Sequence, residues 1–369
     1  MRPTYVKINM SRLRENLRKI RADLPENVTV TAVVKANAYG HGSVEVSRAA
    51  VEEGCDALAV ALPEEALVLR KAGIAVPIYI LGLTLPSSFD EVVESRCIPA
   101  VEDSTDLARL EECAKKRRRT VECCIAVDTG MHRIGIAPEN ALDMAARIET
   151  FPHLKVNGFF SHMANADAAD RSDAEGQIGR FARMVRRVEA QRGTQNRFSL
   201  ANSAGLLSIP ESIFTDVRPG IIMYGLMPSD CVDNRLGLEP VLSFYSQVVH
   251  VQCLRRGESV GYGSAFTAEG PCVVATLPVG YADGYPRCLS NRSSVLIGGK
   301  RCPVVGHICM DQLMVRVPDG VSVAPGDEAV LLGRQGAEEI TADELARLAG
   351  TISYEIVSDV AARVPRQYV

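Results

Sequence analysis

The feature that most constrains the fold is an alternation of short apolar runs with amphipathic stretches between residues 28 and 218. Strands that alternate with helices in this way form parallel sheets, and eight such units close a barrel. The fold class is therefore predicted to be α/β, a (β/α)8 TIM-type barrel. The eight expected strands are Val28–Val34, Ala57–Ala61, Ile78–Leu81, Ile98–Val101, Val121–Val127, Val156–Phe160, Phe198–Leu200 and Thr215–Arg218.

The segments between these runs have helical spacing. The stretch Phe181–Val188 has apolar positions three and four apart, which is typical of a helix with one buried face. Pro63, Pro86 and Ser104 are residues that favour the start of a helix, and each is expected to begin one.

The pattern changes after about residue 230, where short alternating runs are separated by glycine and proline turns. These runs predict an antiparallel β domain over residues 231–369, joined by an N-terminal strand in residues 1–9, while residues 10–230 form the barrel. A helix is expected over Thr341–Leu348. The expected strands of this domain include Ser246–Val251, Cys272–Leu277, Ser294–Ile297 and Glu328–Leu332.

Composition excludes several function classes. The net charge of -4 gives no basic surface for nucleic acid. Eleven cysteines without a Cys-x-x-Cys pair indicate reduced thiols and a cytoplasmic protein, and no apolar run reaches membrane-spanning length. The chain opens directly into the strand Thr4–Ile8, with no apolar signal region. Cys302, His307 and Cys309 lack a second paired motif, so they are interpreted as structural and no metal site is expected.

Lys35 is the first candidate for chemistry. The apolar strand Val28–Val34 ends on this amine, and a glycine-containing turn follows it as far as Gly42. The strand therefore delivers the lysine to the carboxyl-terminal edge of the sheet, where barrels keep their chemistry. An amine held there can form a Schiff base with a carbonyl cofactor.

Further polar residues follow other expected strands. The loops after strands seven and eight are a common phosphate site in barrels. There, Asn202–Ser203 and Gly220–Ile221 offer side-chain donors and backbone N–H groups. A phosphorylated carbonyl cofactor fits both ends, so pyridoxal 5'-phosphate is expected, with Tyr39 and Tyr224 near enough in sequence to help hold it. The other candidates at strand ends are Arg133, His162 and Arg218.

Five motifs together give the chain a specific resemblance over essentially its whole length. They are Ala32–Gly42 around Lys35, Asp128–Gly135 (Asp-Thr-Gly-Met-x-Arg-x-Gly), Arg218–Gly225 (Arg-Pro-Gly-x-x-Met-Tyr-Gly), Gly261–Ser264, and Cys309–Gln312 (Cys-Met-Asp-Gln). The chain resembles the alanine racemases, barrel-type pyridoxal-phosphate enzymes with a C-terminal β domain.

The resemblance implies a two-base interconversion of L-alanine and D-alanine that supplies D-alanine for peptidoglycan. Lys35 and Tyr262 correspond to the bases on opposite faces of the substrate. Arg218 corresponds to the residue facing the pyridine nitrogen of the cofactor, and His162 to the residue that helps link the tyrosine to the cofactor.

The substrate contacts carry over in the same way. Arg133 and the Met310 backbone resemble the contacts to the substrate carboxylate, and Asp311, Tyr281 and Tyr354 resemble residues of the entrance. Tyr354 is equally consistent with core packing, and Asp311 with capping of a turn. In the family Tyr262 and Met310 reach the cofactor from the other subunit, so a homodimer with shared active sites is implied.

Three positions depart from the family pattern. Ala126 stands where many members have a lysine seven residues before the substrate arginine, His132 where glycine is frequent, and His307 where arginine is common. Arg133 therefore lacks its usual partner. A serine or broad-specificity amino-acid racemase is the closest alternative. A decarboxylase would need an acidic residue near the ring nitrogen instead of Arg218, and a cofactor-binding regulator would need no Tyr262.

Overall fold

The computed structural model describes residues 2–193 and 195–369. Its contacts divide these residues into two compact units. The barrel unit consists of Leu13–Ala38 and Ser43–Glu239, and the C-terminal unit of the residues up to Arg12, Tyr39–Gly42 and Pro240–Val369.

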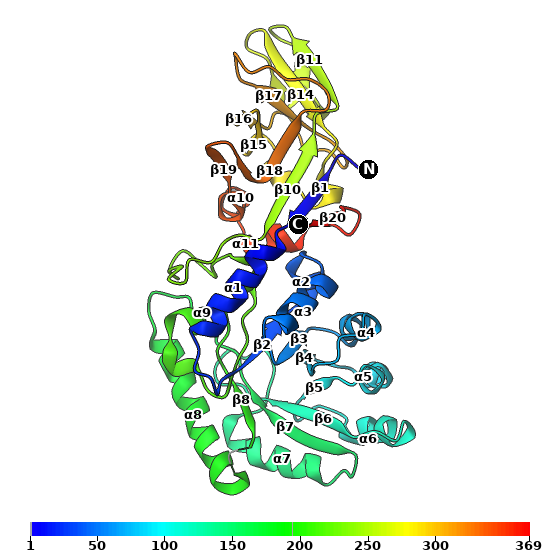
Figure 1. Cartoon of the computed structure of the whole chain (residues 1–369), viewed down its shortest axis with the longest axis vertical. Helices are drawn as coiled ribbons and strands as arrows, with labels where there is room; N and C mark the ends of the chain where they lie inside the picture. The colour runs from blue at the N-terminus through cyan, green and yellow to red at the C-terminus, as the bar shows by residue number, and fades with distance from the viewer. Residues whose placement is uncertain (1, 194) are drawn as a thin grey trace. The chain divides into compact units, whose positions relative to one another are not determined.

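The predicted barrel is confirmed. Eight strands pair in chain order, each parallel to the next, and the last pairs with the first through Thr29 opposite Asp216 and Val30 opposite Val217 (Figure 1). The strands are β2 (Thr29–Val33), β3 (Ala57–Val60), β4 (Ile78–Leu83), β5 (Ile98–Val101), β6 (Val121–Ala126), β7 (Leu154–Phe160), β8 (Arg197–Ser199) and β9 (Asp216–Val217).

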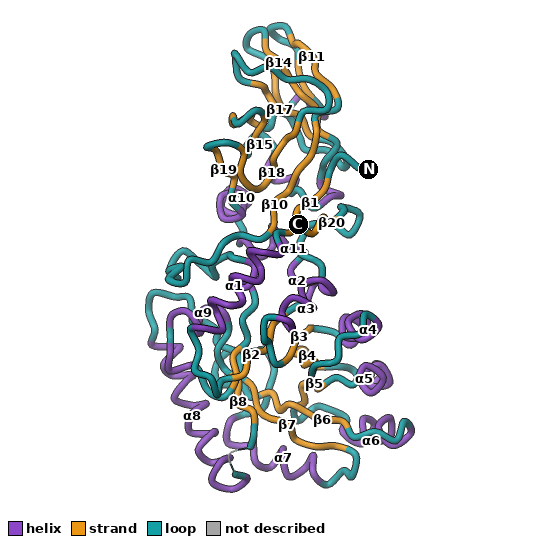
Figure 2. The backbone as a smooth tube through the Cα atoms, viewed as in Figure 1, coloured by secondary structure: helices purple, strands orange, loops and turns teal. Residues whose placement is uncertain are grey.

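The strands are apolar because both of their faces are covered. Every residue of β3 and β5 is buried, as expected when side chains fill the barrel on one face and helices cover the other. The helices lie outside the strands in Figure 2. The helices of this part of the chain are α1 (Met10–Ala22), α2 (Lys35–Tyr39), α3 (Ser43–Glu52), α4 (Pro63–Lys71), α5 (Phe89–Ser95), α6 (Leu107–Lys116), α7 (Ala141–Glu149), α8 (Ser172–Arg192) and α9 (Ser203–Ser208).

The expected helix starts have different outcomes. Pro63 is the first residue of α4, and Pro86 opens a short 3-10 turn that leads into α5. The expectation for Ser104 is wrong. Helix α6 begins three residues later because the Asp106 carboxylate caps it, accepting a hydrogen bond from the Arg109 N–H at 3.0 Å.

The C-terminal unit is built from antiparallel sheets, with one parallel pair between β1 and β20. A seven-stranded sheet has the order β16-β15-β18-β10-β1-β20 with β19 on β18, and β11-β14-β17 and β12-β13 form two smaller sheets. The elements are β1 (Tyr5–Ile8), β10 (Leu242–Gln247), β11 (His250–Leu254), β12 (Ser259–Val260), β13 (Phe266–Thr267), β14 (Cys272–Leu277), β15 (Ser294–Ile297), β16 (Lys300–Pro303), β17 (Leu313–Val317), β18 (Glu328–Gln335), β19 (Glu338–Ile340), β20 (Arg366–Tyr368), α10 (Ala342–Ala349) and α11 (Ser353–Ser358).

The expectation of one strand over Ser246–Val251 is wrong. Strand β10 ends at Gln247, and β11 begins at His250 in a different sheet. The chain changes sheets between them, because the Val248 N–H bonds to the Asp327 carbonyl while the Val249 N–H bonds to the Thr276 carbonyl, each at 2.9 Å.

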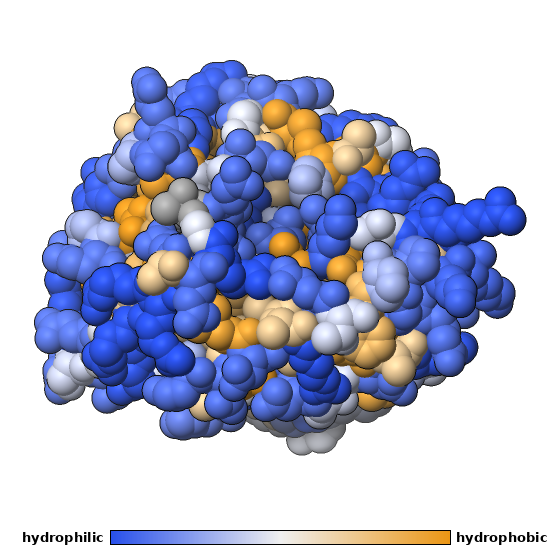
Figure 3. All heavy atoms as spheres, turned by 90° about the horizontal axis from the view of Figure 1, so that it is seen from below, coloured by the Kyte–Doolittle hydropathy of each residue, from blue (hydrophilic) through white to orange (hydrophobic). Residues whose placement is uncertain are grey.

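All eleven cysteines are free thiols. None of the helices in residues 2–193 and 195–369 combines the length and the apolar character needed to cross a membrane. The face seen from below in Figure 3 is predominantly hydrophilic, with hydrophobic side chains in small groups between polar ones.

Candidate active site

Lys35 lies at the end of β2, at the start of an unusual turn. The next four residues, Ala36 to Tyr39, all have positive φ angles between 51° and 54°, so α2 is a left-handed turn. This conformation costs an L-residue other than glycine about 1–2 kcal/mol. The surrounding structure must therefore hold it in place.

Glu65 of α4 provides part of that support. Its Oε1 accepts a hydrogen bond from the Ala36 N–H at 2.6 Å, and its Oε2 accepts from the N–H groups of Ala61 at 2.7 Å and Leu62 at 3.1 Å. One carboxylate thus joins the turn after Lys35 to the start of α4. Sequence analysis missed Glu65, although its place two residues after Pro63 fits the glutamate of a helix capping box.

The Lys35 amine lies in an environment that favours its neutral form. Burial lowers the pKa of Lys35, and the positive charges of Arg133 and Arg218 lower it further, while Glu65 opposes the shift. A neutral amine is the form that can act as a nucleophile or accept a proton.

Arg218 follows β9 and is buried. Its guanidinium donates hydrogen bonds to the Ser199 hydroxyl, to the carbonyls of Ser161 and Leu200, and to His162 Nδ1 at 3.5 Å. Burial lowers the pKa of Arg218 to about 10. Because this value is still well above neutral pH, the guanidinium stays charged there. Burial and the nearby cations, Arg218 first, lower the pKa of His162 to about 3, so His162 itself adds no positive charge at neutral pH.

The loops after β8 and β9, where a phosphate site was predicted, contact each other. Ser203 Oγ accepts the Gly220 N–H at 2.9 Å, and Asn202 Oδ1 caps α9 through the Gly205 N–H at 3.0 Å. Ile221 and Tyr224 form the following 3-10 turn. The buried Tyr224 hydroxyl donates to the Val33 carbonyl at 3.0 Å, which ties this region to the strand that carries Lys35.

Arg133 lies in a loop that folds back on β6. The Ile136 N–H bonds to the Ala126 carbonyl at 3.0 Å, and the Asp128 N–H bonds to the Ile136 carbonyl at 2.8 Å. Arg133 is exposed and lines a small pocket with Ala126, Ser161 and His162. Its guanidinium has no hydrogen-bond or ion-pair partner among the described residues.

The remaining candidates gather in the C-terminal unit. Tyr262, Met310 and Asp311 line one open pocket, and Tyr262 exposes 74% of its surface. Tyr281 lies beside them, because its N–H bonds to the Cys309 carbonyl at 3.1 Å. Asp311 does not cap a turn through its carboxylate; it pairs with Arg363 at 2.6 Å.

Two further candidates contact each other within the C-terminal unit. The rings of Tyr39 and Tyr354 lie 6.1 Å apart and are tilted by 51°. Burial raises the pKa of Tyr39, which keeps its phenol protonated. In the described part of the chain, no three His, Cys, Asp or Glu side chains are placed to hold a metal ion together.

Comparison with known proteins identifies the family. The model of the alanine racemase N-terminal domain matches residues 8–228, and that of the C-terminal domain matches residues 241–368. The chain therefore belongs to the alanine racemase family, which is a family of isomerases.

Individual relatives are similar over the whole chain. The alanine racemase of Symbiobacterium thermophilum is 43% identical, with 100% of this chain and 97% of the relative covered. That of Halothermothrix orenii is 39% identical with the same coverage. The crystal structure of alanine racemase from Bacillus anthracis with bound L-Ala-P has a TM-score of 0.93 and 35% identity, covering 100% of this chain and 95% of that one.

Proposed function

We propose that this protein interconverts L-alanine and D-alanine with pyridoxal 5'-phosphate as its cofactor. The observation that carries the proposal is the Lys35 amine, held on a strained left-handed turn and driven toward its neutral form beside Arg133 and Arg218. Such an amine is suited to bind a carbonyl cofactor. The family to which the chain belongs supports the same assignment.

The donors of the barrel unit fit this cofactor. Lys35 would hold its aldehyde carbon, and Ser203, Gly220 and Ile221, with Asn202 and Tyr224 supporting their loops, would hold its phosphate. Tyr39, whose phenol stays protonated, would also help to hold the cofactor. When bound, the cofactor withdraws electrons from the substrate Cα and so makes the Cα proton acidic.

Arg218 would face the ring nitrogen of the cofactor. A guanidinium only donates hydrogen bonds and keeps its charge, so the nitrogen that it contacts must accept and remain unprotonated. An unprotonated ring stabilises negative charge less strongly, which limits side reactions such as transamination. The neutral His162 beside Arg218 would contribute hydrogen bonding rather than charge.

Two residues of the chain would move the proton. The Lys35 amine would accept or return it on one face of the Cα, and the Tyr262 hydroxyl on the other. Removal from one face and return to the other inverts the configuration. Arg133 would bind the substrate carboxylate together with the Met310 N–H, while Tyr281, Asp311 and Tyr354 would line the entrance.

The exposure of the second base supports a homodimer with shared active sites. Tyr262 and Met310 expose 74% and 53% of their surfaces on the C-terminal unit, which is unusual for large apolar side chains that take part in a water-excluding site. A partner subunit would cover them. We place this enzyme in the cytoplasm, where its D-alanine would serve peptidoglycan synthesis.

Proton exchange in deuterated buffer tests the two bases. With cofactor bound, Tyr262→Phe should exchange the Cα proton of one alanine enantiomer only and lose racemisation, while Lys35→Ala should lose both. Tyr245→Phe is the control, because it removes the same hydroxyl group from a tyrosine that is not part of the proposed site. The ring is retained, and it stacks on Tyr5 with the ring centres 5.5 Å apart. If Tyr262→Phe racemises alanine at the wild-type rate, the two-base proposal is wrong.

A serine or broad-specificity racemase is the second candidate. The buried Ala126 beside Arg133 leaves this pocket without the charge that a lysine would carry, so side-chain preference is set by fewer contacts. Comparison of kcat/KM for alanine and serine separates the two, and we expect alanine to be the better substrate.

A further inference from the structure

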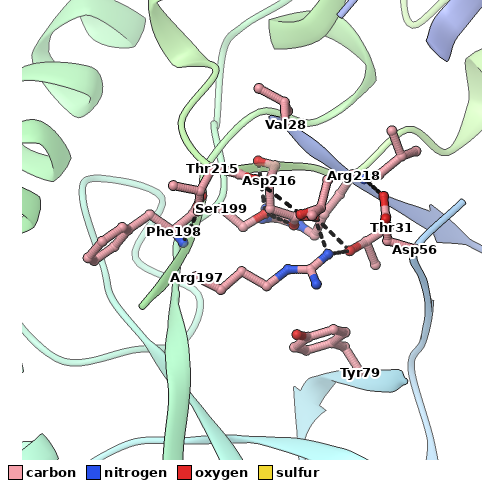
Figure 4. Close-up of polar contacts among 12 residues, drawn as sticks. Val28, Thr31, Asp56, Tyr79, Arg197, Phe198, Ser199, Thr215, Asp216 and Arg218 are labelled. Carbon is pink, nitrogen blue, oxygen red and sulfur yellow. Dashed lines mark hydrogen bonds and ion pairs between the residues drawn. The ribbon is translucent and has the colours of Figure 1, made fainter. Parts of the chain in front are cut away.

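A buried group of charged residues lies inside the barrel next to Arg218. Asp216, the first residue of β9, is 1% exposed, and Arg197 is the first residue of the neighbouring strand β8 (Figure 4). Neither residue belongs to the site proposed above. A carboxylate this deeply buried needs several hydrogen bonds to remain charged, so its contacts indicate what it does.

The two oxygens of Asp216 have different partners. Oδ1 accepts hydrogen bonds from Thr29 at 3.0 Å, from Thr31 at 2.9 Å and from Arg197. Oδ2 accepts one from Ser199 Oγ at 2.5 Å. The Arg197 guanidinium lies 4.8 Å from the centre of the Tyr79 ring, which fixes its position. Oδ1 is thus anchored in the barrel, while Oδ2 bonds to Ser199, which also contacts Arg218.

Ser199 connects the carboxylate to Arg218 with a defined direction. A hydroxyl has one proton to donate, and Ser199 Oγ already accepts a hydrogen bond from Arg218 Nη1. Its own proton is therefore available to Asp216 Oδ2. The chain of donors runs from Arg218 through Ser199 to Asp216.

Among the described residues, Arg218 is hydrogen-bonded to a negative charge only indirectly, through Ser199 to Asp216. Within the described residues it forms no ion pair, and its other acceptors are the neutral carbonyls of Ser161 and Leu200 and the His162 ring at 3.5 Å. Carbonyls accept from the Nη2 side, so Ser199 is what holds Nη1. Loss of Ser199 would leave one end of the guanidinium free to turn.

We propose that Asp216 is a positioning residue for Arg218, and that it acts through the Ser199 hydroxyl to keep the guanidinium directed at the ring nitrogen of the cofactor. This inference rests on the proposed function. If the guanidinium turns away, the ring nitrogen loses a permanent cation that opposes its protonation, and it takes up a proton from water more readily.

The test compares three variants of the cofactor-loaded enzyme, with the ring nitrogen of the cofactor labelled with ¹⁵N. Ser199→Ala breaks the chain by removing one hydroxyl from a strand. Asp216→Asn is the second variant; it removes the negative charge and with it the ion pair of Arg197. Thr29→Val is the matched control, because it removes a hydroxyl from the opposite oxygen of the same carboxylate.

Ser199→Ala and Asp216→Asn share the expected result, because each breaks the series of hydrogen bonds from Arg218 to the carboxylate. The ¹⁵N signal of both variants should move toward that of a protonated ring and vary with pH, while the wild type and Thr29→Val stay unprotonated. Ser199→Ala is the cleaner variant, because Arg197 keeps its partner. The kcat of Ser199→Ala should fall about tenfold with little change in KM, because the interaction acts in the chemical step. The rate of cofactor transamination relative to racemisation should rise.

Other outcomes separate the two proposals. A wild type that binds cofactor and racemises alanine, with equal ¹⁵N signals and pH profiles for Ser199→Ala and Thr29→Val, would overturn the role of Asp216 and leave the proposed function standing. A wild type that takes up no cofactor, or that does not racemise alanine, would overturn both.

Discussion

At the scale of single residues, local sequence predicts candidate reactive groups but not what holds them. Lys35, Arg133, His162 and Arg218 are candidates because polar residues at strand ends meet at one edge of a barrel. The left-handed turn after Lys35 was not predictable, because asparagine adopts positive φ readily but alanine and tyrosine do not, and because the contacts with Glu65 come from another element.

Asp216 and Ser199 were missed for a related reason. Both lie in or beside segments that were interpreted as apolar strands, Thr215–Arg218 and Phe198–Leu200, where a polar side chain has no obvious role. Their function in the fold depends on contacts between β8, β9 and β2, which are distant in sequence. Only the closed barrel brings them together.

The first residue-scale prediction concerns Glu65. Glu65→Ala removes the acceptor of three backbone N–H groups and should lower the free energy of unfolding by about 1–3 kcal/mol. Glu64→Ala, at an exposed neighbouring position, should change it by less than about 0.5 kcal/mol. Urea unfolding measures both values, and equal losses in the two variants would show that Glu65 does not support the turn.

The second residue-scale prediction concerns His162 and the dependence of protein stability on pH. The folded protein keeps His162 neutral down to a pKa of about 3, whereas the unfolded chain binds a proton below about 6.5. The unfolded state therefore gains protons first, and stability should fall as the pH drops from about 6.5 toward 3, by up to ~1.4 kcal/mol per pH unit from this group.

Unfolding of the cofactor-free protein across this pH range tests the effect. His162→Gln, which cannot take up a proton, should show a flatter loss of stability than the wild type. His250→Gln, at an exposed position of β11, serves as the control. Parallel curves for the wild type and His162→Gln would contradict the assignment.

At the scale of elements, the barrel was predictable because its strands are covered on both faces and read as apolar runs. The boundaries of individual strands were less predictable. Strand β8 begins at Arg197, one residue before the expected Phe198, because its first residue carries a charge that is paired inside the barrel. The break between β10 and β11 was hidden because alternation continues through the change of sheet.

An element-scale prediction concerns the turn after Tyr39 and its packing on α11. Gly40 has a φ of +83°, and an added Cβ would lie 2.0 Å from the Val357 carbonyl oxygen. Gly54 has a φ of +86°, but nothing lies within 4 Å of the same position. Gly54→Ala should therefore cost about 1–2 kcal/mol from backbone strain alone.

Gly40→Ala should be more destabilising than Gly54→Ala, because the backbone of α11 must also move. Thermal unfolding of the two variants isolates the steric contribution, since the φ angles are nearly equal. If both variants melt at the same temperature, the turn is not packed against α11 as described.

At the scale of the whole molecule, the chain provides its candidate bases on different units. Lys35 belongs to the barrel unit and Tyr262 to the C-terminal unit. The sequence placed these residues more than two hundred positions apart, and only the resemblance to a family suggested that they serve one site. The exposure of Tyr262 and Met310 adds a physical reason to expect a covering subunit.

Subunit complementation tests this shared site. Lys35→Ala and Tyr262→Phe homodimers should each be inactive. If each site uses the two residues from different subunits, unfolding and refolding them together should produce heterodimers with one intact site and restore up to about a quarter of the wild-type activity. No recovery, despite heterodimers detected by native mass spectrometry, would mean that both bases come from one subunit.

The most direct test of the account is to give the cofactor-loaded wild type L-alanine in deuterated buffer and to follow the Cα proton and the chirality together by NMR. The account predicts that deuterium enters Cα as D-alanine appears, until the two enantiomers are equal. Exchange with full retention of configuration, or no exchange in the presence of bound cofactor, would contradict it.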